Sequence, residues 1–239
     1  MITNNNETFL SLNIREQPDD VTCGPTCLQA VYRYYNDEVT LTEVIKGVKQ
    51  LSSGGTIAVL LGNHALKRGY QATIYTYNLS TFDLSWFKEK VDIAEKLRLQ
   101  LIQKPKEKRM KTATRAYLRF LENGGQIKFE ELTPAFLRSF LDKGTPILTG
   151  LSATYLYESK REIGDFDIRY DDVAGFPSGH FVVINGFDQK KVFVADPLGG
   201  NPISDKQYYQ VTFHKLINSI MLGVMTYDAN LLIIHPKKS

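Results

Sequence analysis

Two periods of apolar and polar positions run through the chain and predict both helices and strands. Apolar residues at helical spacing predict helices over 23–36, 41–51, 56–68, 133–144 and 212–221. Alternating or continuous apolar runs predict strands over 8–14, 70–77, 145–151, 181–187, 192–195 and 230–235. Residues 152–178 are rich in Tyr and Asp and show no period, so we expect a functional surface loop there. An N-terminal helical part followed by a C-terminal antiparallel sheet favours an α+β fold.

Cap residues mark the ends of the early helices. We expect Thr40 or Thr42 to cap the helix at 41–51 and Thr56 to cap the helix that follows it. Gly69 suits the left-handed position just beyond a helix, so the third helix should end there.

A basic, amphipathic segment lies in the middle of the chain. Residues 86–122 carry eleven lysines and arginines against five acidic residues, a net charge of +6. Apolar positions at helical spacing predict two helices joined near Lys104-Pro105-Lys106. We interpret them as a helical insertion at about 83–125 within one domain spanning 1–239. Acidic residues lie among the basic ones, and the segment contains no nucleic-acid-binding motif. We therefore interpret the basic side of these helices as a solvated face and expect no nucleic-acid partner.

Composition narrows the class of protein. The 239 residues are 43% hydrophobic and 23% charged, which is ordinary for a globular chain with one sizeable core. The net charge of +3 is too small to imply a polyanionic partner. The two cysteines lie four positions apart and do not form a disulfide framework. Without a signal peptide or an apolar run of about 20 residues, a cytoplasmic location with no membrane segment is expected, and the oligomeric state stays open.

The stretch around Cys23 has the features of a reactive thiol site. Pro25 suits the first turn of a helix, and the apolar stripe that starts at Leu28 continues that helix. Cys23 is therefore expected at a helix start, where unpaired N–H groups and the helix dipole favour a thiolate. Gln17 lies six residues upstream, and its amide with the Cys23 N–H would form an oxyanion hole. A buried structural cysteine is the alternative for this residue taken alone.

A partner for this thiol is predicted near the other end of the chain. Two β-rich runs around a short polar turn predict an antiparallel hairpin over 179–197. A three-residue turn would pair Phe187 with Lys191. In that register His180 and Asp196 are diagonal neighbours on one face, roughly 7–8 Å apart at the backbone. A two-residue turn would place them on opposite faces. The hairpin thus offers an imidazole held by a carboxylate, as a general base requires.

These stretches together carry a family resemblance. The matching residues are Gln17-Pro-Asp-Asp-Val-Thr-Cys23-Gly-Pro-Thr-Cys-Leu, Gly179-His180-Phe-Val-Val-Ile-Asn-Gly-Phe-Asp and Val194-Ala-Asp196-Pro197. They resemble the papain-like cysteine peptidases, and among these the bacteriocin-processing peptidases that cut after a double-glycine leader. The resemblance implies a papain-like fold in which Gln17 supplies the oxyanion hole, Cys23 attacks, His180 is the base and Asp196 orients it. The chain looks like a free-standing form of that group.

Three functions are compatible with this set of residues. The first is a cysteine-dependent hydrolase that cleaves a peptide or amide bond through a thioester acyl-enzyme. The second is acyl or peptidyl transfer, in which an amine intercepts the same thioester. The third is a catalytically silent binding module that uses the basic helices to hold a partner. A peptide or other amide-containing substrate is expected for the first two, and the sequence does not name it.

The remaining chemistry-bearing residues have simpler interpretations. Cys27 lies one turn after Cys23 and is expected in the core. His64, His214 and His235 show no metal-ligand spacing, and we interpret His64 as a structural residue of the third helix. We expect no metal and no cofactor.

Overall fold

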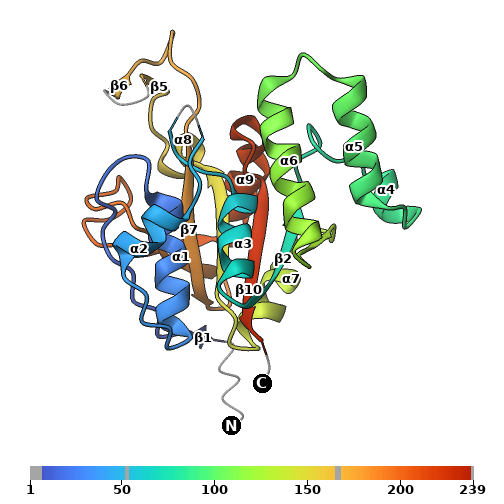
Figure 1. Cartoon of the computed structure of the whole chain (residues 1–239). Helices are drawn as coiled ribbons and strands as arrows, with labels where there is room; N and C mark the ends of the chain where they lie inside the picture. The colour runs from blue at the N-terminus through green and yellow to red at the C-terminus, as the bar shows by residue number, and fades with distance from the viewer. Residues whose placement is uncertain (1–6, 52–53, 165–167, 238–239) are drawn as a thin grey trace.

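The computed structural model describes residues 7–51, 54–164 and 168–237. A large, mostly antiparallel sheet lies at its centre, with helices on both faces (Figure 1). In spatial order, its strands are β3 (Gln126–Lys128), β2 (Tyr70–Thr76), β10 (Asn230–Pro236), β4 (Ile147–Ser152), β7 (Gly179–Phe187), β8 (Lys191–Ala195) and β9 (Tyr208–Thr212). The short β1 (Thr8–Phe9) pairs with β7, and only the β2–β3 pair is parallel in the described sheet.

Helices cover the two faces unequally. The helices are α1 (Cys23–Tyr34), α2 (Leu41–Gly47), α3 (Ala58–Lys67), α4 (Ser85–Lys88), α5 (Ile93–Gln103), α6 (Lys108–Glu122), α7 (Pro134–Leu141), α8 (Ala153–Tyr157), α9 (Phe213–Leu222) and the 3₁₀ turn η1 (Gly223–Thr226). Helices α1 and α3 pack on one face, and α7 and α9 pack on the other. Strand β7 is therefore buried on both sides and reads as a continuous apolar run.

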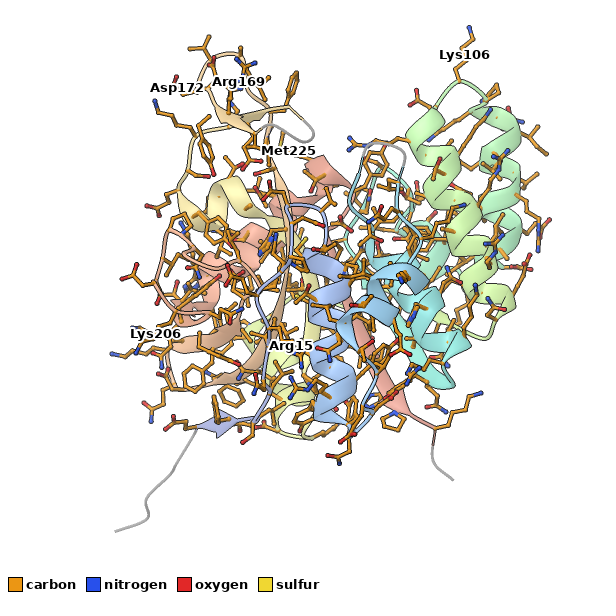
Figure 2. The ribbon with its side chains drawn as sticks, turned by 60° about the vertical axis from the view of Figure 1, so that its left-hand side comes forward. Arg15, Lys106, Arg169, Asp172, Lys206 and Met225 are labelled. Atoms are coloured by element: carbon orange, nitrogen blue, oxygen red, sulfur yellow. The ribbon has the colours of Figure 1, made fainter. Side chains whose placement is uncertain are left out.

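Two hairpins project from the same end of the molecule (Figure 1). One is the helical pair α5–α6, with Lys106 at its tip in Figure 2. The other is the small two-stranded sheet of β5 (Glu162–Ile163) and β6 (Arg169–Tyr170), near which Figure 2 labels Arg169 and Asp172. Helix α6 packs against α3, which joins the helical pair to the main body.

Most predicted elements are confirmed, with three corrections. The segment 152–178 is not an irregular loop, because it contains α8 and the β5–β6 hairpin. The predicted strand at 8–14 is shortened to β1, although Leu10, Leu12 and Ile14 are buried as an apolar alternation requires. The sheet is not confined to the C-terminal half, since β1 and β2 belong to it. The sequence pattern gave no signal for β3 or β9.

Helices and a connection near Pro105 are found within 86–122, but the first of the two predicted helices is divided into α4 and α5, with residues 89–92 between them outside any helix. Their status as an insertion within a single domain stays a prediction. The residues Ser52-Ser53-Gly54-Gly55 predict a turn after the second helix, and the first two of them lie outside the described residues. Among the described residues, no helix combines the length and apolar character that a membrane span needs.

The β7–β8 ribbon turns in a different way from the prediction. The Asp188 N–H donates to the Lys191 carbonyl at 2.9 Å, which leaves a two-residue turn at 189–190, and Phe187 lies opposite Val192 rather than Lys191. A register shift follows between Ile184 and Gly186.

The extra residue of this bulge is Asn185. Its carbonyl accepts from the Leu10 N–H at 2.7 Å, and its side-chain amide donates to the Leu10 carbonyl at 3.1 Å. Beyond the bulge, Val183 lies opposite Ala195. This is the register that a three-residue turn would have produced, so the bulge compensates for the shorter turn.

The buried carboxyl group of Asp228 caps helix α3 in place of the predicted Thr56. The backbone N–H of Ala58, the first helical residue, donates to Asp228 Oδ1 at 3.1 Å. The Thr56 hydroxyl instead donates to the Lys49 carbonyl at 3.3 Å. Burial raises the pKa of Asp228 to about 8, against the opposing effects of the Ala58 hydrogen bond and the Arg109 charge. By contrast, Thr40 caps α2 through a capping box, as predicted.

This cap gives a pH-dependent contribution to stability. Because the folded-state pKa of Asp228 lies above its ordinary value of 3.8, the group favours the folded state at low pH and loses that contribution as the pH rises toward 8. We expect Asp228→Asn to be more stable relative to the wild type at pH 9 than at pH 5. Urea unfolding of both proteins at the two pH values measures this difference. A difference in unfolding free energy that stays constant with pH would contradict it.

Candidate active site

Cys23 is the first residue of α1, as the sequence predicts. Among the described residues, the Thr22 side chain makes no capping hydrogen bond and the first turn of α1 holds no acidic residue. The positive end of the helix therefore faces Cys23 without a neutralising group from its own first turn. The Cys23 side chain is partly buried. A Cβ atom added to the next residue, Gly24, would come within 2.6 Å of the Thr56 side chain. The chain thus packs closely around the start of this helix.

His180 and Asp196 meet across the β7–β8 ribbon. His180 Nε2 lies 2.8 Å from Asp196 Oδ1, and the two side chains are 7% and 0% exposed. The Cys23 side chain lies close enough to the imidazole to contribute to the raised pKa of His180. With Nε2 directed to Asp196, Nδ1 is the ring nitrogen left for the thiol. The structure therefore brings Cys23, His180 and Asp196 together from positions that span more than 170 residues.

Asp196 is held by more groups than the sequence indicates. Its Oδ2 accepts hydrogen bonds from the hydroxyls of Tyr157 and Tyr209, each at 2.7 Å. Its Oδ1 accepts from the Leu198 N–H at 2.9 Å in addition to the histidine. The Tyr157 ring also lies beside the His180 ring, with centroids 5.9 Å apart. Both carboxylate oxygens are therefore satisfied, which a fully buried charge requires.

The two tyrosines were missed because neither lies in a motif. Tyr157 belongs to α8, within the Tyr-rich segment that lacks a period, and Tyr209 belongs to β9, which was not predicted. The abundance of Tyr in 152–178 was the only sequence signal for the first of them.

The charges of the buried pair stabilise one another. Burial lowers the pKa of His180, but the Asp196 charge, the hydrogen bond to Asp196 and the interaction with Cys23 outweigh it and raise that pKa. Burial raises the pKa of Asp196, while the His180 charge and the hydrogen bonds from His180 and the two tyrosines outweigh it and lower that pKa. Both shifts favour an imidazolium beside a carboxylate. Burial and the nearby Asp196 charge raise the pKa values of both tyrosines, so their hydroxyls remain protonated donors.

Gln17 is brought to the neighbourhood of Asp196 but is not joined to the thiol. Its backbone N–H donates to the Pro197 carbonyl at 2.8 Å, one residue beyond Asp196. Its side-chain Nε2 donates to the Asp19 carbonyl at 2.9 Å, and its Oε1 is buried without a partner among the described residues. The amide that the sequence analysis assigns to an oxyanion hole is therefore engaged with its own loop in this structure.

The other cysteine and the third-helix histidine lie elsewhere, as expected. Cys27 is fully buried, and its thiol donates to the Phe181 carbonyl at 3.2 Å. Burial is the main cause that raises the pKa of the Cys27 thiol, followed by the charges of Cys23 and Asp196. His64 Nδ1 is hydrogen-bonded to the Tyr32 hydroxyl at 2.8 Å, which gives it a structural partner.

Comparison with known proteins identifies a family that this chain resembles. The model of the peptidase C39-like family matches residues 107–220. The chain resembles the C39-like peptidases. The family match covers just under half of the chain and includes His180 and Asp196, whereas Gln17 and Cys23 lie before it. The family resemblance predicted from the motifs is thus confirmed.

Solved structures extend the likeness to the C39-like fold. A C39-like peptidase from Bacillus anthracis superposes with a TM-score of 0.51 at 14% identity, covering 98% of this chain and 99% of that chain. A double-glycine-motif protease from an AMS/PCAT transporter, solved in complex with its leader peptide, gives 0.47 at 16% identity over 96% and 95% of the two chains. The peptidase domain of Streptococcus ComA gives 0.44 at 11% identity over 95% and 99%. The sequence matches no curated protein. The papain-like α+β fold class is confirmed.

The tyrosine pair around Asp196 makes a testable contribution to stability. Each of Tyr157→Phe and Tyr209→Phe removes one hydrogen bond to a buried carboxylate, so each should lower the free energy of unfolding by about 1.5–3 kcal/mol. Urea unfolding at neutral pH measures the loss.

Tyr155→Phe is the matched control for these variants. Its hydroxyl accepts a hydrogen bond from Asn218 at an exposed position, so the change should cost at most about 0.5 kcal/mol. If the control were as destabilising as the two variants, the carboxylate network would not be the cause of their loss.

Proposed function

We propose that this protein is a cysteine peptidase that cleaves a peptide or amide bond through a thioester acyl-enzyme. The observation that supports it best is the buried, hydrogen-bonded His180–Asp196 pair, whose imidazole interacts electrostatically with Cys23 at the start of a helix. The resemblance to the C39-like peptidases supports the same reaction class. The proposed roles are nucleophile for Cys23, general base and acid for His180, orienting carboxylate for Asp196 and oxyanion donor for Gln17.

Acylation follows from these positions. The proton of the Cys23 thiol resides on His180 Nδ1 as part of the imidazolium, and the sulfur attacks the carbonyl carbon of the scissile bond as a thiolate. The carbonyl oxygen becomes an oxyanion, which the Cys23 backbone N–H at the helix start can stabilise. His180 then returns the proton to the leaving amine as the C–N bond breaks. Asp196 keeps Nε2 engaged throughout, so the ring presents the correct nitrogen to the sulfur.

Gln17 needs a small rearrangement to join the oxyanion hole. Its Nε2 must exchange the Asp19 carbonyl for the oxyanion, and the Pro197 hydrogen bond already fixes its backbone beside the site. Catalytic hydrogen bonds in substrate-free sites are often incomplete and tighten only when substrate is bound. Deacylation reverses the proton path: His180 takes a proton from water, and the hydroxide releases the acyl group from sulfur.

The reactivity of the two cysteines is the first test. Cys23 is partly buried beside an imidazolium, whereas Cys27 is fully buried with a raised pKa. Iodoacetamide at neutral pH should therefore label Cys23 well before Cys27, and His180→Ala should slow that labelling by about tenfold. Mass spectrometry of tryptic peptides over time measures both rates. Equal labelling of the two thiols would instead favour the binding-module function.

Analysis of the reaction products distinguishes hydrolysis from acyl transfer. Incubation with a peptide library should yield new carboxyl termini, and Cys23→Ala should reduce their rate of formation by at least about a thousandfold. Cys27→Ala is the matched control and should keep the activity. When a primary amine is added, products that carry the amine at the new terminus would identify an acyl transferase. Identical product patterns from the wild type and Cys23→Ala would contradict both enzymatic functions.

A further inference from the structure

A second concave site lies away from Cys23, between α3, α6 and the segment that follows α2. The cavity has a volume of about 220 Å³. Its floor is formed by the buried residues Leu60, Asn63 and Ala116. Four exposed basic side chains stand around it: Lys49, Lys67, Arg115 and Arg119. Figure 1 shows α3 and α6 side by side along this part of the molecule.

The charge around this cavity is not balanced by the protein. None of the described side chains that line it is acidic. Within the described part of the chain, none of the four basic side chains forms an ion pair or a side-chain hydrogen bond. Two nearby arginines behave differently, since Arg68 pairs with Asp37 and Arg98 lies 3.9 Å from Glu122. Gathering four like charges raises the energy of the free protein, and a bound anion would lower it.

The geometry of the basic groups suits a compact anion. Arg115 and Arg119 are four residues apart on α6, so their guanidinium groups project from the same face of the helix. Guanidinium groups bind phosphate oxygens in a bidentate manner, and lysines add positive point charges. Lys67 on α3 and Lys49 after α2 approach the cavity from the other side. Three separate segments therefore direct positive charge at one space.

Size and lining narrow the class of ligand. Sites for drug-sized molecules measure about 300–1,000 Å³, so this cavity fits something smaller. The floor is largely apolar, which suits a short carbon skeleton beneath the charged head. A nucleic acid would need an open track and aromatic stacking partners, and no Phe, Tyr or Trp is among the described residues that line the cavity.

We propose that this cavity binds a small organic phosphate with at least two negative charges. The site is independent of the proposed peptidase reaction, because Cys23, His180 and Asp196 do not line it. Recognition rests on the Arg115–Arg119 pair for the phosphate group, on the two lysines for the remaining charge and on the apolar floor for the carbon skeleton.

Isothermal titration calorimetry of the full chain at low ionic strength tests the proposal. The probes are glycerol 3-phosphate, inorganic pyrophosphate, citrate and, as the neutral analogue, glycerol. Glycerol 3-phosphate should bind with a Kd below about 1 mM, and binding should weaken as salt is added. The double variant Arg115→Gln/Arg119→Gln should weaken it by about tenfold or more. Lys88→Gln/Lys96→Gln removes the same charge from the helical segment outside the cavity and should leave binding unchanged.

Each outcome bears on the proposal in a definite way. The proposal is supported if glycerol 3-phosphate binds tightly to the wild type and only the arginine double variant loses this affinity. No binding of either phosphate, equal weakening in the two double variants, or tighter binding of citrate than of glycerol 3-phosphate overturns it. Circular dichroism and thermal unfolding check that the variants fold. Because Cys23 labelling by iodoacetamide is measured separately, failure here leaves the proposed peptidase function standing, and failure there leaves this site standing.

Discussion

The buried carboxylate of Asp196 is the constraint on which the arrangement of the site depends. A charge that is removed from water must be fully hydrogen-bonded, and this one receives donors from His180, Tyr157, Tyr209 and the Leu198 backbone. These donors come from β7, α8, β9 and the loop after β8, so four segments must be in place together. The position of the imidazole beside Cys23 follows from the joint placement of these four segments.

The central sheet holds these four segments in their relative positions. Strands β4 and β7 are covered by helices on both faces, which leaves little freedom for the backbone that carries His180. Helix α1 packs on β7 and brings its first residue to the same end. Helix α1, which begins with Cys23, is thus placed by apolar packing, whereas His180 is oriented by polar contacts. Packing sets the approximate distance between the two groups, and hydrogen bonds set the direction of the ring.

Sequence reasoning reached the parts of the site that depend on local pattern. Pro25 and the apolar stripe after it place Cys23 at a helix start, and the continuous apolar run after His180 identifies its strand. Contacts between distant segments could not be predicted from the sequence. Tyr157 and Tyr209 lie in stretches without a hydrophobic period, and the cap of α3 comes from Asp228, 170 residues away from Ala58. The Gln17 motif gave no indication that its amide would bond to Asp19. Local periodicity carries no information about which polar groups meet after the chain folds.

The bulge at Asn185 has a consequence for how the β7–β8 ribbon tolerates change. On one side of it the strands follow the register of the tight turn, and on the other side they follow the register that aligns His180 with Asp196. The hydrogen bonds between Asn185 and Leu10 hold the division between the two registers. The register at the distal turn is thereby separate from the register at the end of the ribbon that carries His180 and Asp196. A change in the length of the turn can accordingly be taken up at the bulge without a change in the pairing of Val183 with Ala195.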